Sequence, residues 1–240
     1  MARRYGFRGG LVPGATVYGY VTRALLDRFG PRWVDAGAAR IRFLAPCYDG
    51  DELVVSVSPD GAFVGQVGEK VCVVGSAPIP PPGPGGVEPP AIPAAPIPAR
   101  DGRPAASEET LAEGRVLGTV TQPVDPDTAS EYLTRIGEPS SWYATEGVVH
   151  PGLLLEGANR VLMANVVLPA WLHVESDMRH LRRLSVGEEV EVRARVAGQF
   201  VRKGHHFVEL DVNWIAFGEP VAFGSHTAIW QLAAGGRLEH

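Results

Sequence analysis

The sequence predicts an α+β fold made of two copies of one unit, each a buried helix followed by antiparallel strands. Three observations indicate this. A Pro-Gly pair opens an apolar stretch twice, at Pro13-Gly14 and at Pro151-Gly152, 138 positions apart. Apolar residues after each pair recur at the spacing of one helix face. Beyond each helix, apolar residues alternate with polar or charged ones, as in 190–196, which is typical of half-exposed strands.

The similarity between the two copies extends well beyond the Pro-Gly pairs. Several landmarks keep the same order: Gly9 and Gly147, Gly19 and Gly157, Trp33 and Trp171, Gly50-Asp51-Glu52-Leu53 and Gly187-Glu188-Glu189-Val190, and Gly68-Glu69-Lys70-Val71 and Gly218-Glu219-Pro220-Val221. Chance would produce one Pro-Gly pair but not this ordered series. We infer that one unit was duplicated.

The first unit, residues 1–77, is expected to hold one helix and four short strands. The helix runs from about Pro13 to Phe29 and ends at Gly30-Pro31. The strands are expected at 40–44, 52–58, 62–64 and 70–74.

A connector, residues 78–114, is expected to join the units. Its Pro, Gly and Ala content up to Pro104 favours an extended, semi-rigid chain, followed by a weak helix over 107–114. Residues 236–240 resemble the remnant of a histidine tag.

The second unit, residues 115–235, begins with a strand over 115–124 and a short helix that Asp125 caps, Thr128–Ile136. The main helix starts at Pro151. Residues 171–173 are expected to end in a loop. Later strands are expected at 178–181, 188–196, 206–217 and 221–231, with a hairpin turn at 203–205.

Composition excludes several classes of protein. The net charge is −5 and basic residues are not clustered, so nucleic acid is not an expected partner. No apolar run approaches a membrane span of ~20 residues. The absence of a signal-peptide pattern and the presence of only two cysteines, Cys47 and Cys72, favour a cytoplasmic location. Histidines and carboxylates show no regular metal-ligand spacing, so no metal is expected.

Two stretches, Gly147-Val148-Val149-His150-Pro151-Gly152 and 204–212, resemble parts of the MaoC-like acyl dehydratases. The first is similar to the Pro-Val-Met-Pro-Gly helix entry of 3-hydroxyacyl-carrier-protein dehydratases. The resemblance implies a double hotdog fold, in which an acyl thioester lies between paired helices with its carbonyl near a helix N-terminus. It also implies that the acyl group is carried on coenzyme A or the phosphopantetheine of an acyl-carrier protein, and that there is no further cofactor.

The sequence departs from both catalytic patterns that this resemblance implies. MaoC-like hydratases carry Asp-x4-His before the helix, where this chain has Glu138 and Tyr143. The carrier-protein dehydratases place a Glu six residues after the Pro of Pro-Gly. Gly157 occupies that position here, and Glu156 is one residue early, about 100° around the helix.

His150 and Glu138 are the main candidates for proton transfer. The repeat partner of His150 is Val12, so the fold does not require a histidine there, and an imidazole suits acid–base chemistry near neutral pH. The alternative is a histidine that caps the helix. Glu138, between Gly137 and Pro139, is either a general base or acid or a solvated loop carboxylate.

Four further residues are candidates for binding or orienting the substrate. The Gly152 N–H is a candidate donor to a developing oxyanion, or the glycine is needed where two helices approach. Tyr143 is a candidate hydrogen-bond donor, although Tyr5 at the equivalent place favours a packing role. Glu156 faces Arg160 at ion-pair spacing, and Asn159 either orients a substrate carbonyl or joins the helices.

The predicted activity is an acyl-thioester hydro-lyase, which adds or removes water across the 2,3-bond. A thioesterase that uses Glu138 or Glu156, and a non-catalytic acyl-thioester binding protein, are the alternatives. Arg202 and Lys203 are candidate contacts for a carrier phosphate. An apolar cavity lined by Leu153, Leu155 and Trp171 would hold the acyl chain, and a homodimer is expected.

Overall fold

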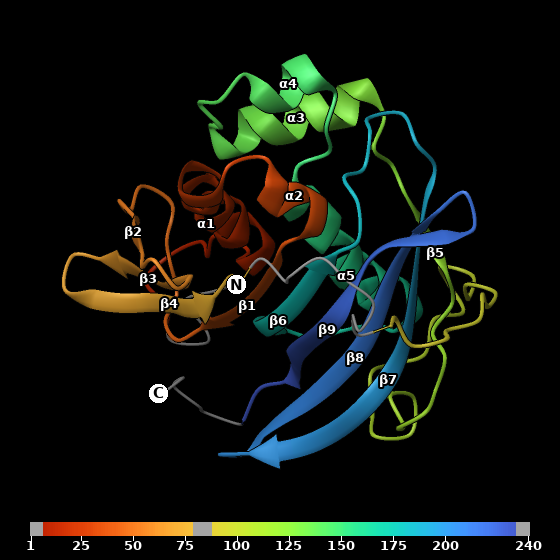
Figure 1. The fold of residues 1–240 in the computed structure, drawn as a ribbon. Coiled ribbons are helices and arrows are strands. Elements are labelled where there is room, and N and C mark those ends of the chain that lie inside the picture. The colour runs from red at the N-terminus through yellow and green to blue at the C-terminus, as the bar shows by residue number, and fades with distance from the viewer. Residues whose placement is uncertain (1–6, 79–87, 234–240) are drawn as a thin grey trace.

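One antiparallel sheet and the helices that it wraps make up the computed structural model, which describes residues 7–78 and 88–233 (Figure 1). Within these residues the sheet has nine strands in the order β2-β3-β4-β1-β6-β9-β8-β7-β5. The long helices α1 and α5 pack beside each other against it, and α3 and α4 lie together at one end of the molecule (Figure 1).

The first half of the chain forms two helices and four strands. They are α1 (Gly14–Phe29), α2 (Arg32–Ala36), β1 (Ala38–Phe43), β2 (Val54–Val57), β3 (Ala62–Val67) and β4 (Lys70–Ser76). The predicted helix over 13–29 is therefore confirmed. All four predicted strands are present too, within a few residues of the expected bounds.

The second half forms three helices and five strands. They are β5 (Val120–Gln122), α3 (Pro126–Ile136), α4 (Trp142–Glu146), α5 (Pro151–Asn165), β6 (Leu172–His180), β7 (Val190–Arg202), β8 (His205–Ala216) and β9 (Glu219–Gln231). Asp125 caps α3 as predicted, since its side chain accepts from the Thr128 N–H. The hairpin turn between β7 and β8 also lies where the sequence placed it.

The strand order repeats outward from the centre of the sheet. On one side of the central β1–β6 pair the order is β1-β4-β3-β2, and on the other it is β6-β9-β8-β7. The repeated glycines adopt a positive φ in both copies. Gly50 and Gly187 precede β2 and β7 with φ of 84° and 94°, and Gly68 and Gly218 turn the β3–β4 and β8–β9 hairpins with φ of 58° and 81°. A positive φ suits glycine because it has no Cβ.

The sheet is tied to the first turns of α5 by two side chains. The Trp214 Nε1–H donates to the Leu154 carbonyl at 2.7 Å, and the Gln122 amide donates to the Leu153 carbonyl. Gly157 lies on the same contact, where a Cβ would sit 2.8 Å from Val192 and 2.9 Å from Trp214 Nε1. The close packing of α5 on the sheet therefore requires glycine there and leaves no room for the glutamate of the carrier-protein dehydratases.

Three local predictions were wrong. Residues 107–114 form turns rather than a helix, and the strand expected over 115–124 is reduced to β5 and a single bridge between Val116 and Arg195. The strand β6 starts at Leu172, so 171–173 does not end in a loop. A bulge between His173 and Glu175 interrupts its alternation, which hid the start of the strand in the sequence.

Two sequence predictions concern segments at the limits of the described chain. The described part of the connector, 88–104, contains no helix or strand and turns at 100–102. The suggested tag remnant at 236–240 lies outside the described residues. No helix in 7–78 or 88–233 has the length and apolar character to cross a membrane.

Candidate active site

The start of α5 is closed by a histidine side chain. His150 is the N-cap of the helix, and its Nδ1 accepts a hydrogen bond from the Gly152 N–H at 3.0 Å. Pro151 fills the first helical position, where the absence of an N–H costs nothing. In the first copy Val12 cannot make such a bond, and no side chain caps α1. The capping role considered for His150 is therefore present.

Glu138 lies against this cap. The helix α3 ends at Gly137 in the left-handed conformation (φ 62°), which turns the chain inward. Glu138 Oε2 lies 3.8 Å from His150 Nε2, and both side chains are only 1–2% exposed. The other carboxylate oxygen accepts from the Ser140 N–H at 2.9 Å and from Arg23 at 3.4 Å. The fold thus brings together the two residues that the sequence proposed for proton transfer.

The cap also fixes the tautomer of His150. Because Nδ1 accepts from the backbone, the proton of the neutral ring is on Nε2, which faces Glu138. Burial lowers the pKa of His150 below its usual value, although Glu138 opposes that shift. Burial acts to raise the pKa of Glu138, but His150 and the Ser140 amide lower it on balance. Near neutral pH the pair is therefore an imidazole and a carboxylate.

Aromatic side chains surround the pair and leave polar atoms without partners. The rings of Tyr143 and Tyr132 lie 4.5 Å and 5.2 Å from the His150 ring, between centroids. The hydroxyls of Tyr18, Tyr132 and Tyr143 are buried without a hydrogen-bond partner, as is His150 Nε2. Burial raises the pKa of all three phenols, so they remain donors. Unpaired buried polar atoms are costly, so their concentration around His150 is a feature that core packing does not explain.

The structure corrects the role expected for Gly152. Its N–H is bonded to His150, so it does not face a substrate oxygen. The glycine is needed for packing instead, because a Cβ there would overlap the Tyr132 hydroxyl and sit 3.0 Å from Gly19 Cα. Of the two roles considered for this residue, the steric one is what the structure shows.

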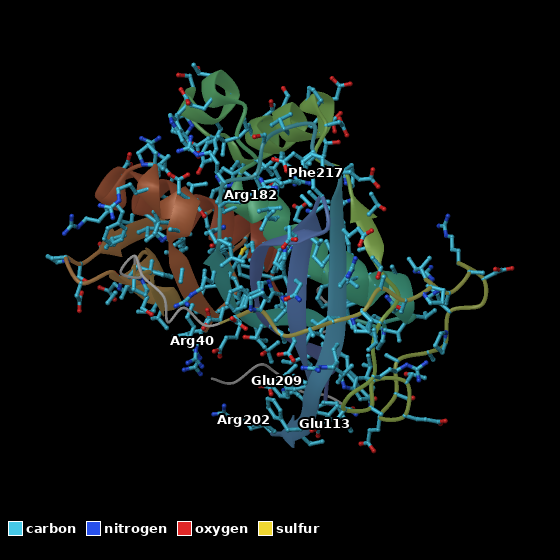
Figure 2. The ribbon with its side chains drawn as sticks, turned by 45° about the vertical axis from the view of Figure 1, so that its right-hand side comes forward. Arg40, Glu113, Arg182, Arg202, Glu209 and Phe217 are labelled. Carbon is cyan, nitrogen blue, oxygen red and sulfur yellow. The ribbon has the colours of Figure 1, made fainter. Side chains whose placement is uncertain are left out.

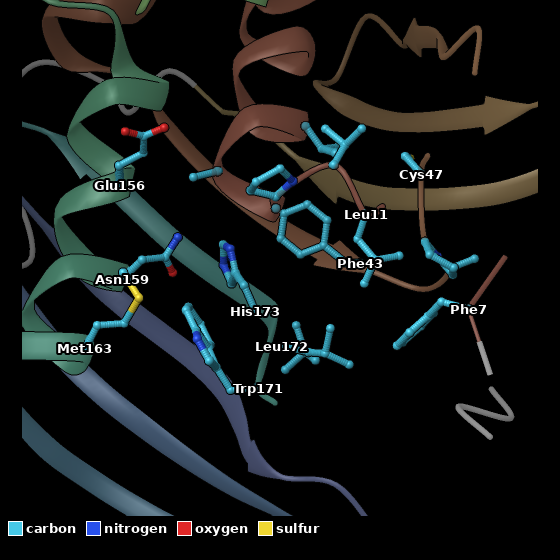
Figure 3. Close-up of a pocket in the computed structure, with 18 of the residues that line it drawn as sticks. Phe7, Leu11, Phe43, Cys47, Glu156, Asn159, Met163, Trp171, Leu172 and His173 are labelled. Carbon is cyan, nitrogen blue, oxygen red and sulfur yellow. The ribbon is translucent and has the colours of Figure 1, made fainter. Parts of the chain in front are cut away.

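A large cavity lies at the other helix start. It has a volume of about 670 Å³ and opens between the N-terminus of α1, the middle of α5 and the start of β6 (Figure 3). Its polar lining includes Glu156, Asn159 and His173, and the rest is mainly apolar. Trp171 lines it as predicted, but Leu153 and Leu155 are buried in the core. His150, Glu138 and Tyr143 do not line it.

A second, smaller cavity of about 310 Å³ reaches Glu138. It also contacts Gly19, Tyr20 and Arg23 of α1. Val12 and Cys47 line both this cavity and the larger one. The carboxylate of Glu138 therefore borders a space that shares a wall with the apolar cavity.

Glu156 and Asn159, which the sequence proposed for substrate binding, both lie on the wall of the larger cavity. Glu156 pairs with Arg135 at 2.6 Å and with Arg160 at 3.9 Å, so the predicted helix ion pair is present but is the weaker of two. Burial raises the pKa of Glu156 against the opposing effect of both arginines. Asn159 Oδ1 is buried without a partner.

Arg202 and Lys203 lie apart from both cavities. They line a hollow of about 660 Å³ formed with Arg40, Arg42 and other side chains of the sheet. Figure 2 shows Arg40 and Arg202 on that face. Among the described residues, no cluster of three or more His, Cys, Asp or Glu side chains could hold a metal ion.

The sequence analysis did not propose Tyr18, Tyr132 or His173 as site residues. Tyr18 and Tyr132 were not singled out because aromatic residues on helices usually belong to the core, which these do as well. His173 was expected in a loop, because the bulge in β6 interrupts the alternation of that strand. One available signal was its repeat partner, Asp35, since a polar residue that differs between the copies is not required by the fold.

Comparison with known proteins shows the fold. No protein-family model and no curated protein matches the chain. The chain is similar to the solved structure of RV0216 from Mycobacterium tuberculosis, described as a double hotdog fold. The two are 17% identical, with 94% of this chain and 83% of that one covered and a TM-score of 0.61.

Two enzymes with solved structures are also similar over nearly the whole chain. A MaoC-like dehydratase is 11% identical, with 96% and 87% of the two chains covered and a TM-score of 0.60. The acyl-CoA thioesterase II TesB2 from Mycobacterium marinum is 15% identical, with 95% and 92% covered and a TM-score of 0.55. The predicted double hotdog fold is confirmed, because these likenesses extend over both units.

Proposed function

We propose that this double hotdog protein is an acyl-thioester hydro-lyase whose proton transfer depends on Glu138 and His150. The proposal is carried by one observation: a buried carboxylate, 3.8 Å from a neutral imidazole, borders a cavity that shares a wall with a large apolar one. Cavities of 300–1,000 Å³ are typical of small-molecule sites, so the larger one has room for an acyl chain.

The chemistry assigned to the pair balances without another group. In the dehydration direction, the Glu138 carboxylate removes a proton from C2 of a 3-hydroxyacyl thioester. The bond between C3 and the hydroxyl oxygen then breaks, and the same proton leaves with the hydroxyl as water. His150 keeps its proton and donates a hydrogen bond from Nε2–H to the carboxylate or the hydroxyl, because Nδ1 is held by the helix. The unpaired Tyr143 hydroxyl is the donor we assign to the developing enolate oxygen.

A second candidate function is hydrolysis of the thioester. The observation that favours it is Glu156, a carboxylate on the wall of the larger cavity whose pKa burial raises. Such a group is suited to remove a proton from water at the thioester carbon. A non-catalytic acyl-thioester binding protein would use the same cavity without either reaction.

The carriers and the assembly form part of the proposal. The substrate is an acyl group on coenzyme A or on the phosphopantetheine of an acyl-carrier protein, with no further cofactor and no metal. Arg202 and Lys203, at the tip of the β7–β8 hairpin, are proposed to contact the carrier's phosphate. The working form is proposed to be a homodimer.

A thioester panel separates the three functions. The protein is incubated with 3-hydroxyacyl and 2-enoyl thioesters of several lengths, while product mass and free thiol are followed. Interconversion with gain or loss of water supports the hydro-lyase, and thiol release supports the thioesterase. Thermal stabilisation by the thioesters without turnover supports the binding protein. The hydro-lyase proposal is wrong if no interconversion occurs with any substrate of the panel.

A further inference from the structure

A chain of three polar residues, of which Ser176 and His226 are buried, ends at His173 in the large apolar cavity. His173 Nε2 lies 2.8 Å from Ser176 Oγ, which lies 3.0 Å from His226 Nδ1. Ser176 and His226 are cross-strand neighbours on β6 and β9 and are 1% and 0% exposed. Phe43 packs edge-on against the His173 ring, with centroids 4.7 Å apart. The two strands and this contact hold His173 in one orientation at the cavity wall (Figure 3).

Two polar atoms at this wall have no partner. His173 Nδ1 and Asn159 Oδ1 are both buried without a hydrogen bond. Asn159 reaches the cavity from α5 and His173 from β6, and Figure 3 shows the two side chains next to each other. Leaving a buried polar atom unpaired costs about 1–3 kcal/mol, so a ligand that pairs these atoms is favoured over one that does not.

The start of α1 adds hydrogen-bond donors at the same place. No side chain caps this helix, unlike α5, and the N–H groups of Gly14 and Ala15 are too early in the helix to have an intrahelical acceptor. His173 Nδ1 lies where a Gly14 Cβ would be only 2.6 Å away. The missing side chain of Gly14 is thus what allows the imidazole to approach the helix start.

The two histidines of this chain of polar residues are uncharged near neutral pH. Burial, and then the neighbouring His226, lower the pKa of His173 well below its usual value. Burial lowers the pKa of His226 to about 3. On the same cavity wall, Glu156 pairs with Arg135 at 2.6 Å and with Arg160 at 3.9 Å. His173 and Asn159 therefore offer uncharged polar atoms without partners, and the start of α1 offers backbone donors beside them. A hydroxyl group both donates and accepts, and it matches this combination.

We propose that the large cavity binds an aliphatic chain that carries a hydroxyl group, and that His173 and Asn159 bind this hydroxyl beside the first turn of α1. Where the chain is the acyl part of a thioester, the inference rests on the proposed function and defines its substrates as hydroxylated acyl groups. The hydroxyl group is bound by residues of the cavity and not by residues that contact the carrier. It can therefore be tested without a carrier.

The test compares two ligands that differ in one hydrogen-bond donor. Decanol and its methyl ether are titrated into the full-length protein in a calorimeter or against a fluorescent fatty-acid probe. One hydrogen bond contributes about 0.5–1.5 kcal/mol, so we expect decanol to bind more tightly by roughly threefold to tenfold. This preference should disappear in His173→Phe, which keeps an aromatic ring, and fall in Asn159→Leu. Met163→Leu changes an apolar residue of the same cavity and should leave the preference intact.

A second readout guards against loss of folding in the His173 variant. In wild-type protein, the imidazole nitrogen resonances of His173 should shift when decanol binds and should not shift with the ether. Equal affinity for both ligands, or a preference that survives both His173→Phe and Asn159→Leu, would overturn the proposal. Failure of the thioester panel with a retained preference for decanol would refute the proposed enzyme but not this site. Interconversion of the thioester panel with equal affinity for decanol and its ether would refute this site but not the proposed enzyme.

Discussion

The Gly152 N–H donates to His150 Nδ1 at 3.0 Å, and this bond places the proton of the neutral imidazole on the nitrogen that faces Glu138. One side chain thereby closes the start of α5 and presents a donor to a buried carboxylate. In the first copy Val12 stands at the same position, and the start of α1 remains open. The two helix starts therefore have different chemistry within one fold.

Substituting His150 separates its two roles. Asparagine is a good N-cap residue, so His150→Asn should keep the stability of α5 and remove the imidazole. His150→Val copies Val12 and should remove both the helix cap and the imidazole. We expect a loss of about 1 kcal/mol in the free energy of unfolding. Both variants should lose hydro-lyase activity to a similar extent. Urea denaturation and turnover assays measure the two effects, and unchanged turnover in both variants would show that the imidazole has no part in the reaction.

Removing the charge of Glu138 should affect both catalysis and its neighbour. General acid–base groups contribute on the order of a hundredfold to ten-thousandfold in rate, so Glu138→Gln should lower kcat within that range. The carboxylate also raises the pKa of His150 against the effect of burial, so the pKa of His150 should fall further in this variant. NMR titration of the imidazole follows that shift. Glu156→Gln is the matched control, because it removes a carboxylate of the other cavity. Comparable turnover losses in both variants would point to the thioesterase instead.

The buried histidines predict how stability depends on pH. Burial lowers the pKa of His180 to about 4 and of His226 to about 3, whereas an unfolded histidine titrates near 6.5. Between these values the unfolded chain binds more protons, so the free energy of unfolding should fall as pH falls below about 6.5. Each such group adds a slope of up to about 1.4 kcal/mol per pH unit.

The variant His226→Phe tests whether a buried histidine causes this pH dependence of stability. It removes one titrating group, so the slope of stability against pH between 6 and 4 should decrease by about one proton's worth, roughly 1.4 kcal/mol per pH unit. Urea denaturation at several pH values measures it. A slope identical to that of the wild type would mean that His226 does not remain neutral in the folded protein.

The close approach of α1 and α5 should be sensitive to one methyl group. In Gly152→Ala the new Cβ meets the Tyr132 hydroxyl and lies 3.0 Å from Gly19 Cα, which should destabilise the fold by about 1–3 kcal/mol. Tyr132→Phe removes the overlapping oxygen, so the double variant should recover part of that loss. Gly10→Ala serves as the control, since nothing lies within 4 Å of its Cβ position. Additive losses in the double variant would rule out the contact with Tyr132.

Much of the fold could be predicted because duplication made its requirements visible. Gly50 and Gly187, or Gly68 and Gly218, recur because turns at these places need a positive φ. Comparison of the copies also identified His150 as an addition of the second one. The sequence could not show which hydrogen-bond partner each polar group has. The donor role expected for the Gly152 N–H was wrong because the bond to His150 depends on a side-chain orientation.

The site was only partly predictable for a related reason. The first copy has no counterpart of His150 or Glu138, and no local pattern indicated that the larger cavity lies at its helix start. Pro13 and Gly14 line that cavity together with residues of α5 and β6 from the second copy. Pairing of distant segments of this kind is set by tertiary packing. Local patterns do not contain it.

The central pairing of β1 with β6 joins the two copies within one continuous chain. In a symmetric dimer of single units, every substitution at a helix start would appear twice, so a histidine cap at one start would also close the other. The fused chain is free of that constraint. A substitution in the fused chain changes one helix start and leaves the other unchanged, so a capped α5 can lie beside an open α1.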